Sequence, residues 1–413
     1  MAYQRRSVAA PDAVAALPTL SESLFNSTVE ELKWYAAALP GRTPTRKADL
    51  VDAILAALMD PDTLQRLWEA LTPGQRDVVA EVVHRGGGRY AADVIAAKYP
   101  GVTPPRSPRG NYGYSYFSSS QRPAATAFDL FFARDYDLGT FIPSDLALAL
   151  RTLAPPPPPL RLATRDDPPL DLAAAAAKRL GVQPEVTVTE TERAVFHDLT
   201  ATLALIQEGK VAVGPKTGAS SLGSVRQLRD RLLLGDYLPD EYERADDAIR
   251  PFALIAIVQA AKWAVPSGAG NKLALTKAGA TLLGRGAIGA REVRHAWESW
   301  RKGGQLDELS RVRAIKGQGS KSTRLTKPAE RRAKVEAVLR VAPPERWIAL
   351  RDFFRYMRAE RQSPEVERNE YTALYVGWSA EYGSLGYSGG DYWDVVIGSY
   401  VRALLWEYAA TLG

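Results

Sequence analysis

Apolar residues recur at helical spacing in two neighbouring stretches of residues 27–58, and a short polar turn separates them. Thr28 and Glu31 have the three-residue spacing of a capping box, so a helix is expected to begin after Thr28. Pro40 ends this helix, and Thr45 is placed to cap a second one. The positions expected to face a core are Val29, Leu32, Ala36 and Leu39 in the first helix and Leu50, Ile54 and Leu58 in the second. The pattern predicts two short amphipathic helices that form a hairpin.

The rest of the chain alternates helical patterns with short strand-like stretches. In residues 72–152 and again in residues 190–285, helices are followed by a hairpin in the order that is typical of a winged helix. Residues 100–126 are rich in Pro, Gly, Ser and Tyr and lack periodicity, which predicts a mobile insertion in the first of these units. The predicted domains are 1–71 (tail and helical hairpin), 72–152, 153–189 (a proline-rich linker), 190–285 and 286–413 (a basic and aromatic helical region).

The predicted fold class is therefore mainly α, a helical hairpin followed by winged-helix-like units with small β-hairpins and a C-terminal helical region. In the final helix the apolar positions are Trp393, Val396, Ile397, Tyr400, Leu404 and Tyr408. A stripe of this kind is typical of a helix that packs on a core. We expect these aromatic residues to be structural.

Composition and charge narrow the possible functions only slightly. The chain has 413 residues, with 53 Lys and Arg against 47 Asp and Glu, a net charge of +6. This excess favours an anionic partner, although it is small for the length of the chain. There is no Cys, which excludes disulfides and thiolate chemistry. No apolar run is long enough to span a membrane, and the N-terminus lacks the apolar core of a signal peptide, so a cytoplasmic location is expected.

The turn between the first two predicted helices is basic. Arg42, Arg46 and Lys47 cluster there, beside the hydroxyl of Thr45. Cations at the N-terminus of a helix oppose the helix dipole, so helix stability does not account for them. Free backbone N–H groups, a hydroxyl and three cations together suit a phosphate group. The alternative interpretation is an ordinary hairpin with a solvated turn.

Two other basic groups are candidates for contacts with DNA phosphates. Residues 313–334 form the most basic region and contain the single acid Glu330. The candidates in this region are Lys316, Lys321, Arg324, Lys327, Arg331, Arg332 and Lys334. A weaker group consists of Lys216, Arg226 and Arg229. Binding of this kind is salt-dependent and nearly independent of base sequence. Charge runs are also common in solvated segments that bind no specific partner.

Reading of bases by the winged helices is not expected. The third helix of a winged helix needs polar residues on its outer face to contact bases. The corresponding segments, residues 127–133 and 249–262, are mainly apolar. We expect both segments to be buried and the winged helices to act as scaffolds or as partner-binding modules.

The sequence offers little for catalysis. Its three histidines, His84, His197 and His295, are far apart in separate predicted helices. No zinc-protease motif or other His-based metal spacing is present, and residues 317–322 lack the glycine that precedes the lysine of a P-loop. We therefore expect no enzyme activity, no cofactor and no metal. A site assembled from distant carboxylates remains a third hypothesis.

The hairpin resembles the SAP motif, a small helix–turn–helix element that binds DNA in many chromatin and repair proteins. The residues that carry the resemblance are Thr28-x-x-Glu31-Leu32, the turn, and Arg46-Lys47-Ala48-Asp49-Leu50; Thr45 stands where the family usually has Gly. The resemblance implies that the turn and the start of the second helix contact DNA.

The second half resembles the helicase-associated winged-helix regions of bacterial DNA-processing proteins, including the N-terminal region of XPB-type helicases. The residues concerned are Leu203-x-x-Ile206 through Lys216-Thr217-Gly218, and Lys272-Leu273-Ala274-Leu275-Thr276-x-x-Gly279. In such proteins another module usually follows, so the chain is expected to be either a short member or a piece of something longer. The resemblance implies a role in repair, genome maintenance or defence against foreign DNA.

Together these observations predict a non-enzymatic, largely sequence-independent DNA-binding protein that recruits or positions DNA-processing partners. Duplex DNA is the expected ligand. The competing hypothesis is a protein-interaction subunit of a larger complex, whose winged helices bind protein and whose cations face an acidic partner.

Overall fold

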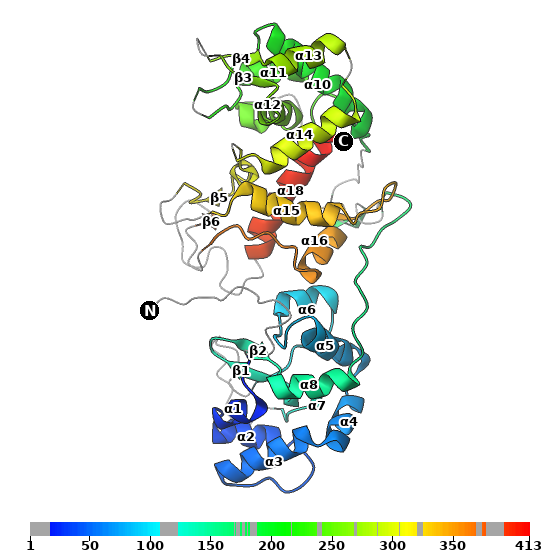
Figure 1. Cartoon of the computed structure of the whole chain (residues 1–413), viewed down its shortest axis with the longest axis vertical. Helices are drawn as coiled ribbons and strands as arrows, with labels where there is room; N and C mark the ends of the chain where they lie inside the picture. Colours follow the sequence, from blue (N-terminus) through cyan, green and yellow to red (C-terminus); the bar gives the residue numbers. More distant parts are fainter. Residues whose placement is uncertain are drawn as a thin grey trace. The chain divides into compact units, whose positions relative to one another are not determined.

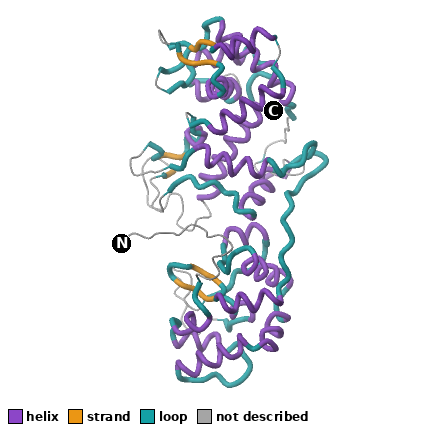
Figure 2. Tube along the Cα trace, viewed as in Figure 1, coloured by secondary structure: helices purple, strands orange, loops and turns teal. Residues whose placement is uncertain are grey.

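The protein is described by a computed structural model in which most of the chain is placed. The described residues are 17–107, 123–168, 170, 174–175, 178–179, 181, 188–215, 217–237, 242–267, 271–286, 288–304, 306–319, 325–368, 374–376 and 392–413. These residues are mainly helical, and their strands form small two-stranded antiparallel sheets (Figure 2). The expected mainly α fold class is confirmed.

The chain divides into two compact units. The N-terminal unit is Met1–Ala163 with Leu350–Arg361, and the C-terminal unit is Thr164–Ala349 with Gln362–Gly413. Both units are therefore discontinuous in sequence. In the described part of the chain, no helix is both long and apolar enough to cross a membrane.

The N-terminal unit begins with the expected helical hairpin (Figure 1). Its first helices are α1 (Leu20–Phe25), α2 (Val29–Ala36), α3 (Lys47–Met59) and α4 (Pro61–Glu69). The capping box before α2 is formed, since the Glu31 amide donates to the Thr28 hydroxyl at 3.3 Å and the Thr28 amide donates to the Glu31 carboxylate at 2.6 Å. Of the predicted core positions, Leu32, Ala36, Leu50, Ile54 and Leu58 are buried, and Val29 and Leu39 pack against them half-buried.

The following elements have the order expected for a winged helix. They are α5 (Pro73–His84), α6 (Ala92–Lys98), α7 (Ala127–Leu130), β1 (Ala133–Asp135), β2 (Gly139–Phe141) and α8 (Ser144–Leu153). Strands β1 and β2 pair with Ala133 opposite Phe141, and Arg89 adds an isolated bridge to Phe141. Most of the predicted insertion, residues 108–122, lies outside the described residues.

A helix from late in the chain completes the N-terminal unit. Helix α16 (Leu350–Ala359) packs against α6, and the Arg355 guanidinium donates to the Ala97 carbonyl at 2.7 Å. Met357 and Phe354 of this helix are buried. Local periodicity predicts that a helix forms, but it carries no information on which distant helix will cover its apolar face.

The C-terminal unit repeats the winged-helix order. Its elements are α10 (Thr191–Gln207), α11 (Leu222–Arg229), η3 (Ala245–Asp247), α12 (Arg250–Ala260), β3 (Ala264–Pro266), β4 (Leu273–Leu275) and α13 (Lys277–Arg285). Strands β3 and β4 pair with Val265 opposite Ala274, and Ala212 adds a bridge to Lys272. A Cβ atom on Gly279 would lie 2.1 Å from the Trp263 carbonyl, so only glycine allows α13 to start this close to the hairpin.

Further helices follow the second hairpin. They are α14 (Ala290–Lys302), η4 (Glu308–Arg311), α15 (Pro328–Leu339) and a final helical segment, Trp393–Leu412, which contains α18 (Gly398–Ala403). A short sheet joins β5 (Ile315–Lys316) to β6 (Tyr375–Val376). The predicted stripe of the final segment is buried as expected, at Trp393, Val396, Ile397, Tyr400, Leu404 and Tyr408.

Candidate nucleic-acid interface

The turn between α2 and α3 presents four exposed residues at the start of a helix. They are the predicted candidates Arg42, Thr45, Arg46 and Lys47. The expected cap at Thr45 is wrong by one residue, because the N-cap of α3 is Arg46 and no side chain accepts a hydrogen bond from the first turn. The backbone N–H groups that begin α3 therefore lack a side-chain cap, and Asp49 is the acid in that turn.

The cations of this turn differ in how they are engaged. Lys47 donates through Nζ to the Phe25 carbonyl at 2.8 Å and lies 5.4 Å from the Phe25 ring centroid, so it is tied to the end of α1. Arg42 and Arg46 form no hydrogen bond or ion pair with any residue that the structure describes. These two guanidinium groups are consequently available to a ligand, and Lys47 is only partly so.

Two arginines of the basic region 313–334 lie in the core of the C-terminal unit. Arg331 and Arg332 are 1% and 2% exposed. Arg332 pairs with the buried Glu308 at 2.5 Å, donates to the Gly303 and Leu306 carbonyls at 2.7 Å, and also donates to the Trp300 carbonyl. Its guanidinium lies 4.4 Å from the Trp300 ring centroid. The prediction that Arg332 is a phosphate contact is wrong for this structure, because its donors are used inside the protein.

Arg331 is also buried, but its contacts are an ion pair and an aromatic ring instead of a network of hydrogen bonds. It forms an ion pair with Asp307 at 2.5 Å, and its guanidinium lies 5.1 Å from the centroid of the Tyr400 ring. It is therefore also unavailable to DNA in this structure. Burial raises the pKa of Glu308, and the charge and hydrogen bonds of Arg332 oppose that increase.

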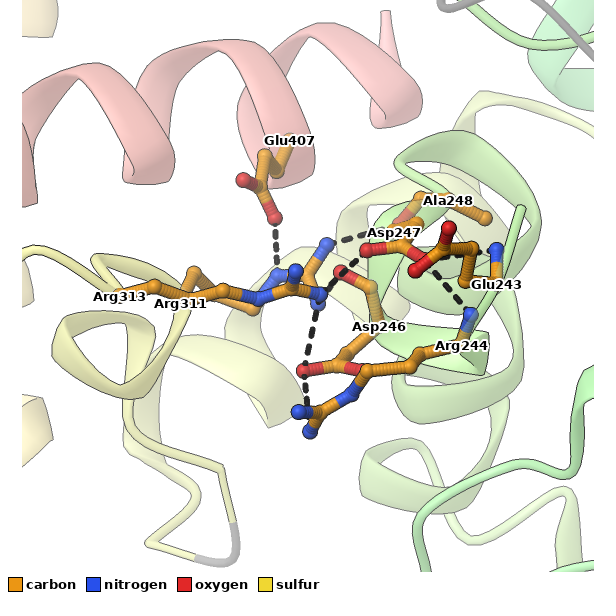
Figure 3. Close-up of polar contacts among 8 residues, drawn as sticks. All are labelled: Glu243, Arg244, Asp246, Asp247, Ala248, Arg311, Arg313 and Glu407. Atoms are coloured by element: carbon orange, nitrogen blue, oxygen red, sulfur yellow. Dashed lines mark hydrogen bonds and ion pairs between the residues drawn. The ribbon is translucent and has the colours of Figure 1, made fainter. Parts of the chain in front are cut away.

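A second set of ion pairs engages Arg313, the first residue of the basic region, and Arg311 just before it (Figure 3). Arg313 pairs with Asp247 at 2.5 Å and with Asp246 at 3.3 Å. Arg311 donates to the Asp246 and Ala248 carbonyls at 2.9 and 2.7 Å and pairs with Glu407 of the final helical segment. These contacts join η3, η4 and the final helical segment within one unit.

The carboxylates of this network respond to different environments. Burial raises the pKa of Glu407, against the opposing charge and hydrogen bond of Arg311. Hydrogen bonds from the Arg244 backbone and the Arg313 side chain lower the pKa of the half-buried Asp247. Arg311 and Arg313 are each paired with carboxylates, and the side chain of Arg311 is only 5% exposed, so Arg311 is not a surface cation.

The remaining candidates of the C-terminal unit fall into three groups. Lys316, Lys327 and Lys334 are exposed and form no ion pair with a described residue. Arg226 donates to the Tyr242 carbonyl at 2.6 Å, and Arg229 pairs with Asp230 at 2.6 Å while lying 5.8 Å from the Tyr242 ring centroid. Lys216, Lys321 and Arg324 lie outside the described residues. Among its described residues, the basic region thus contributes separate lysines instead of a continuous cationic surface.

Both helices that would occupy the recognition position of a winged helix are buried. Helix α7 has only four residues, and Phe128, Asp129 and Leu130 are each at most 3% exposed. Helix α12 is buried over most of its length, and its Arg250 forms an ion pair with the buried Asp198. Neither helix presents the polar outer face that base contacts require.

The histidines have structural partners. His84 Nε2 lies 2.8 Å from the Ala154 carbonyl, His197 Nδ1 lies 3.1 Å from the Asp198 carboxylate, and the His295 ring stacks on Trp263. Over the residues that the structure covers, no group of three or more His, Asp or Glu side chains is placed to hold a metal ion.

One cationic group was missed by reasoning from charge runs. Residues 248–291 contain six Lys and Arg but no Asp or Glu. Four of these cations, Lys262, Lys272, Lys277 and Arg285, are exposed and form no ion pair with a described residue. These cations are widely spaced along the sequence, so a search for clusters of Lys and Arg does not find them. The absence of Asp and Glu over 44 residues is the feature of the sequence that could have indicated them.

Comparison of the chain with protein-family models, with curated proteins and with solved structures gives no match. The resemblances to the SAP motif and to helicase-associated winged helices therefore stay predictions, and the functional argument depends on the residues themselves.

Proposed function

We propose that the protein binds DNA without enzymatic activity and largely without regard to base sequence, and that the turn between α2 and α3 holds the phosphate backbone. The observation that carries this proposal is the pair of exposed guanidinium groups of Arg42 and Arg46, which form no ion pair with a described residue and belong to the turn that leads into the uncapped start of α3. Both groups sit where cations do not help the helix, so their placement favours a ligand that is anionic.

The chemistry of this turn suits a phosphate. The first N–H groups of a helix point along its axis and attract an anion, and guanidinium groups bind phosphate oxygens in a bidentate manner. Thr45 is exposed beside these groups, and its hydroxyl can donate to a phosphate oxygen. Contacts of this type position a protein on DNA but do not distinguish bases.

The burial of α7 and α12 supports binding that is independent of sequence. A protein that lacks a polar recognition helix depends on phosphate contacts, and each contact adds about 0.9 to the slope of log affinity against log salt. A role in recruiting or positioning DNA-processing partners, in repair, genome maintenance or defence, follows from the resemblances and forms the wider part of the proposal.

The proposal is tested by fluorescence anisotropy with a labelled duplex and a labelled single strand over a salt series. The variant Arg42→Glu with Arg46→Glu should weaken duplex binding several-fold, because two attractive contacts become repulsive. A matched control, Arg193→Glu with Lys302→Glu, changes the same total charge at exposed positions elsewhere. Equal losses in both variants, or no loss in the first with its thermal unfolding unchanged, would refute the role of the turn.

A second candidate function is recruitment of a protein partner. The specific observation in its favour is the consecutive pair Leu233 and Leu234, which are 57% and 46% exposed. Neighbouring exposed leucines are typical of protein-binding surfaces. If the chain binds no DNA at low salt, affinity capture with wild-type protein and with Leu233→Ser plus Leu234→Ser would test this function.

A further inference from the structure

The hairpin of β3 and β4 in the C-terminal unit is bordered by three unpaired lysines. Lys262 precedes β3, Lys272 precedes β4, and Lys277 begins α13 directly after β4. All three are exposed, and none forms an ion pair or side-chain hydrogen bond with a described residue. They lie within the acid-free segment 248–291, so no carboxylate follows or precedes them closely in sequence.

Backbone contacts hold these lysines on one small framework. The Thr276 hydroxyl donates to the Lys262 carbonyl at 2.9 Å, which places Lys262 beside the start of α13. The Val213 amide donates to the Asn271 carbonyl at 2.6 Å, which fixes the segment that carries Lys272. Figure 1 shows β3 and β4 next to α13 in this unit.

Two of the lysines occupy positions that local stability does not favour. Lys262 follows the end of α12 with φ +57°, in the left-handed region where glycine is usual and a side chain is strained. Lys277 is the first residue of α13, where a cation opposes the helix dipole. A lysine at a helix C-terminus does interact favourably with the dipole, which is the structural alternative for Lys262.

Both strands of the hairpin have residues that are exposed to solvent. Lys272 and Ala274 are exposed, Leu273 between them is buried, and Val265 opposite Ala274 is 44% exposed.

We propose that the β3–β4 hairpin, through Lys262, Lys272 and Lys277, is a second binding surface for the phosphate backbone of duplex DNA. This proposal rests on the proposed function for its ligand, DNA. The hairpin, however, lies in the C-terminal unit and uses different residues from the turn between α2 and α3. The protein then holds DNA through both units, and the binding of one unit raises the effective concentration of DNA at the other.

The test uses the full chain and a labelled duplex over a salt series. The variant Lys262→Glu with Lys272→Glu and Lys277→Glu should bind roughly tenfold more weakly or worse at low salt, and its salt slope should fall by up to about three. The pair Arg42→Glu and Arg46→Glu is measured in parallel, with Arg193→Glu plus Lys302→Glu as the charge control.

The outcomes separate the two proposals. Loss with the lysine variant but not with the arginine pair supports the hairpin surface and refutes the turn. Loss with the arginine pair alone refutes the hairpin surface and leaves the proposed function standing. A lysine variant that loses no more than the charge control also overturns the hairpin surface, and a wild-type chain that does not bind DNA overturns both.

A single substitution distinguishes a binding lysine from a structural one. Lys262→Gly removes the cation and also relieves the left-handed strain. We expect an unchanged or higher melting temperature together with a several-fold loss of duplex affinity. A lower melting temperature with unchanged affinity would make Lys262 a structural residue and remove it from the surface.

Discussion

The turn at residues 42–47 and the basic region at residues 313–334 contain the same residue types but present them differently. In the turn, Arg42 and Arg46 are exposed and have no partner among the described residues. In the basic region, Arg331 and Arg332 are buried and paired with Asp307 and Glu308. Among the described residues, the region with more positive charge in its sequence thus offers fewer unpaired arginines to a ligand.

The difference comes from carboxylates that lie elsewhere in the chain. Asp307 and Glu308 immediately precede the basic region, and folding brings α15 over them. A buried guanidinium must be paired and hydrogen-bonded because transferring a charge out of water is costly. Charge density along a sequence therefore predicts a binding surface only where no tertiary contact supplies the opposite charge.

The largest expected effect is on stability, at Arg332. Arg332→Ala leaves Glu308 buried without its partner and should lower the free energy of unfolding by about 3–5 kcal/mol. Arg42→Ala removes an exposed side chain and should change it by less than about 0.5 kcal/mol. Chemical unfolding followed by circular dichroism measures both. Similar values for the two variants would contradict the distinction between the regions.

The stability lost at Arg332 should also depend on pH. Burial raises the pKa of Glu308, so this carboxylate takes up a proton more readily in the folded protein than in the unfolded chain. The contribution of Glu308 to the free energy of unfolding therefore falls as the pH rises from the ordinary pKa of a glutamate through the raised pKa of the folded state. Arg332→Met removes the opposing charge and raises this pKa further. The stability deficit of Arg332→Met should therefore shrink as the pH is lowered from neutrality toward the ordinary pKa of a glutamate.

Thermal unfolding of Arg332→Met at several pH values, relative to wild type, provides the measurement. The double variant Arg332→Met with Glu308→Gln is the control, since it lacks the titrating group and its deficit should be independent of pH. A deficit that grows on acidification would show that Glu308 is not the group responsible.

A smaller effect is expected on DNA binding by the lysines that remain exposed in the basic region. We expect each of the substitutions Lys316→Glu, Lys327→Glu and Lys334→Glu to reduce duplex affinity less than a substitution at an arginine of the turn. The reason is that a lysine ammonium contacts a phosphate as a point charge, whereas a guanidinium can bind it through two hydrogen bonds. Their combined loss of duplex affinity should be a few-fold, compared by anisotropy with the loss for Arg42→Glu plus Arg46→Glu. A larger loss for the lysines would reverse the ranking of the two regions.

A small effect on stability is expected at Arg313, whose side chain is paired but partly exposed. Its pairs with Asp246 and Asp247 lie near the surface, where an ion pair contributes at most about 1 kcal/mol. Arg313→Ala should therefore lower the free energy of unfolding by less than the change at Arg332, in the same denaturation experiment. A loss as large as that of Arg332→Ala would mean that the network in Figure 3 acts as a buried one.

Local pattern was sufficient for much of the secondary structure. The capping box at Thr28 and Glu31 and the stripe Leu50, Ile54 and Leu58 appear in the structure as predicted, because each depends on residues within one or two helical turns. The cap of α3 was misplaced by one residue, since hydroxyl side chains near a helix start do not all accept a hydrogen bond.

The candidate binding residues were only partly predictable. Their positions on helices and turns follow from spacing, and the burial of α7 and α12 follows from their apolar composition. The loss of Arg331 and Arg332 as surface cations and the availability of Lys262 and Lys277 do not follow from spacing. Those outcomes depend on whether a distant carboxylate reaches the same place.

Residue order alone thus establishes where helices begin and end, which face of each is apolar, and that the chain carries no thiol. The three-dimensional fold adds the assignment of α16 to the N-terminal unit and the division of the arginines into buried and exposed groups. The physical reason is range, because capping and periodicity act over a few residues. The partner of a charge or of an apolar face can lie much farther along the chain, 24 residues away for Arg332 and Glu308 and 258 residues away for Arg355 and Ala97.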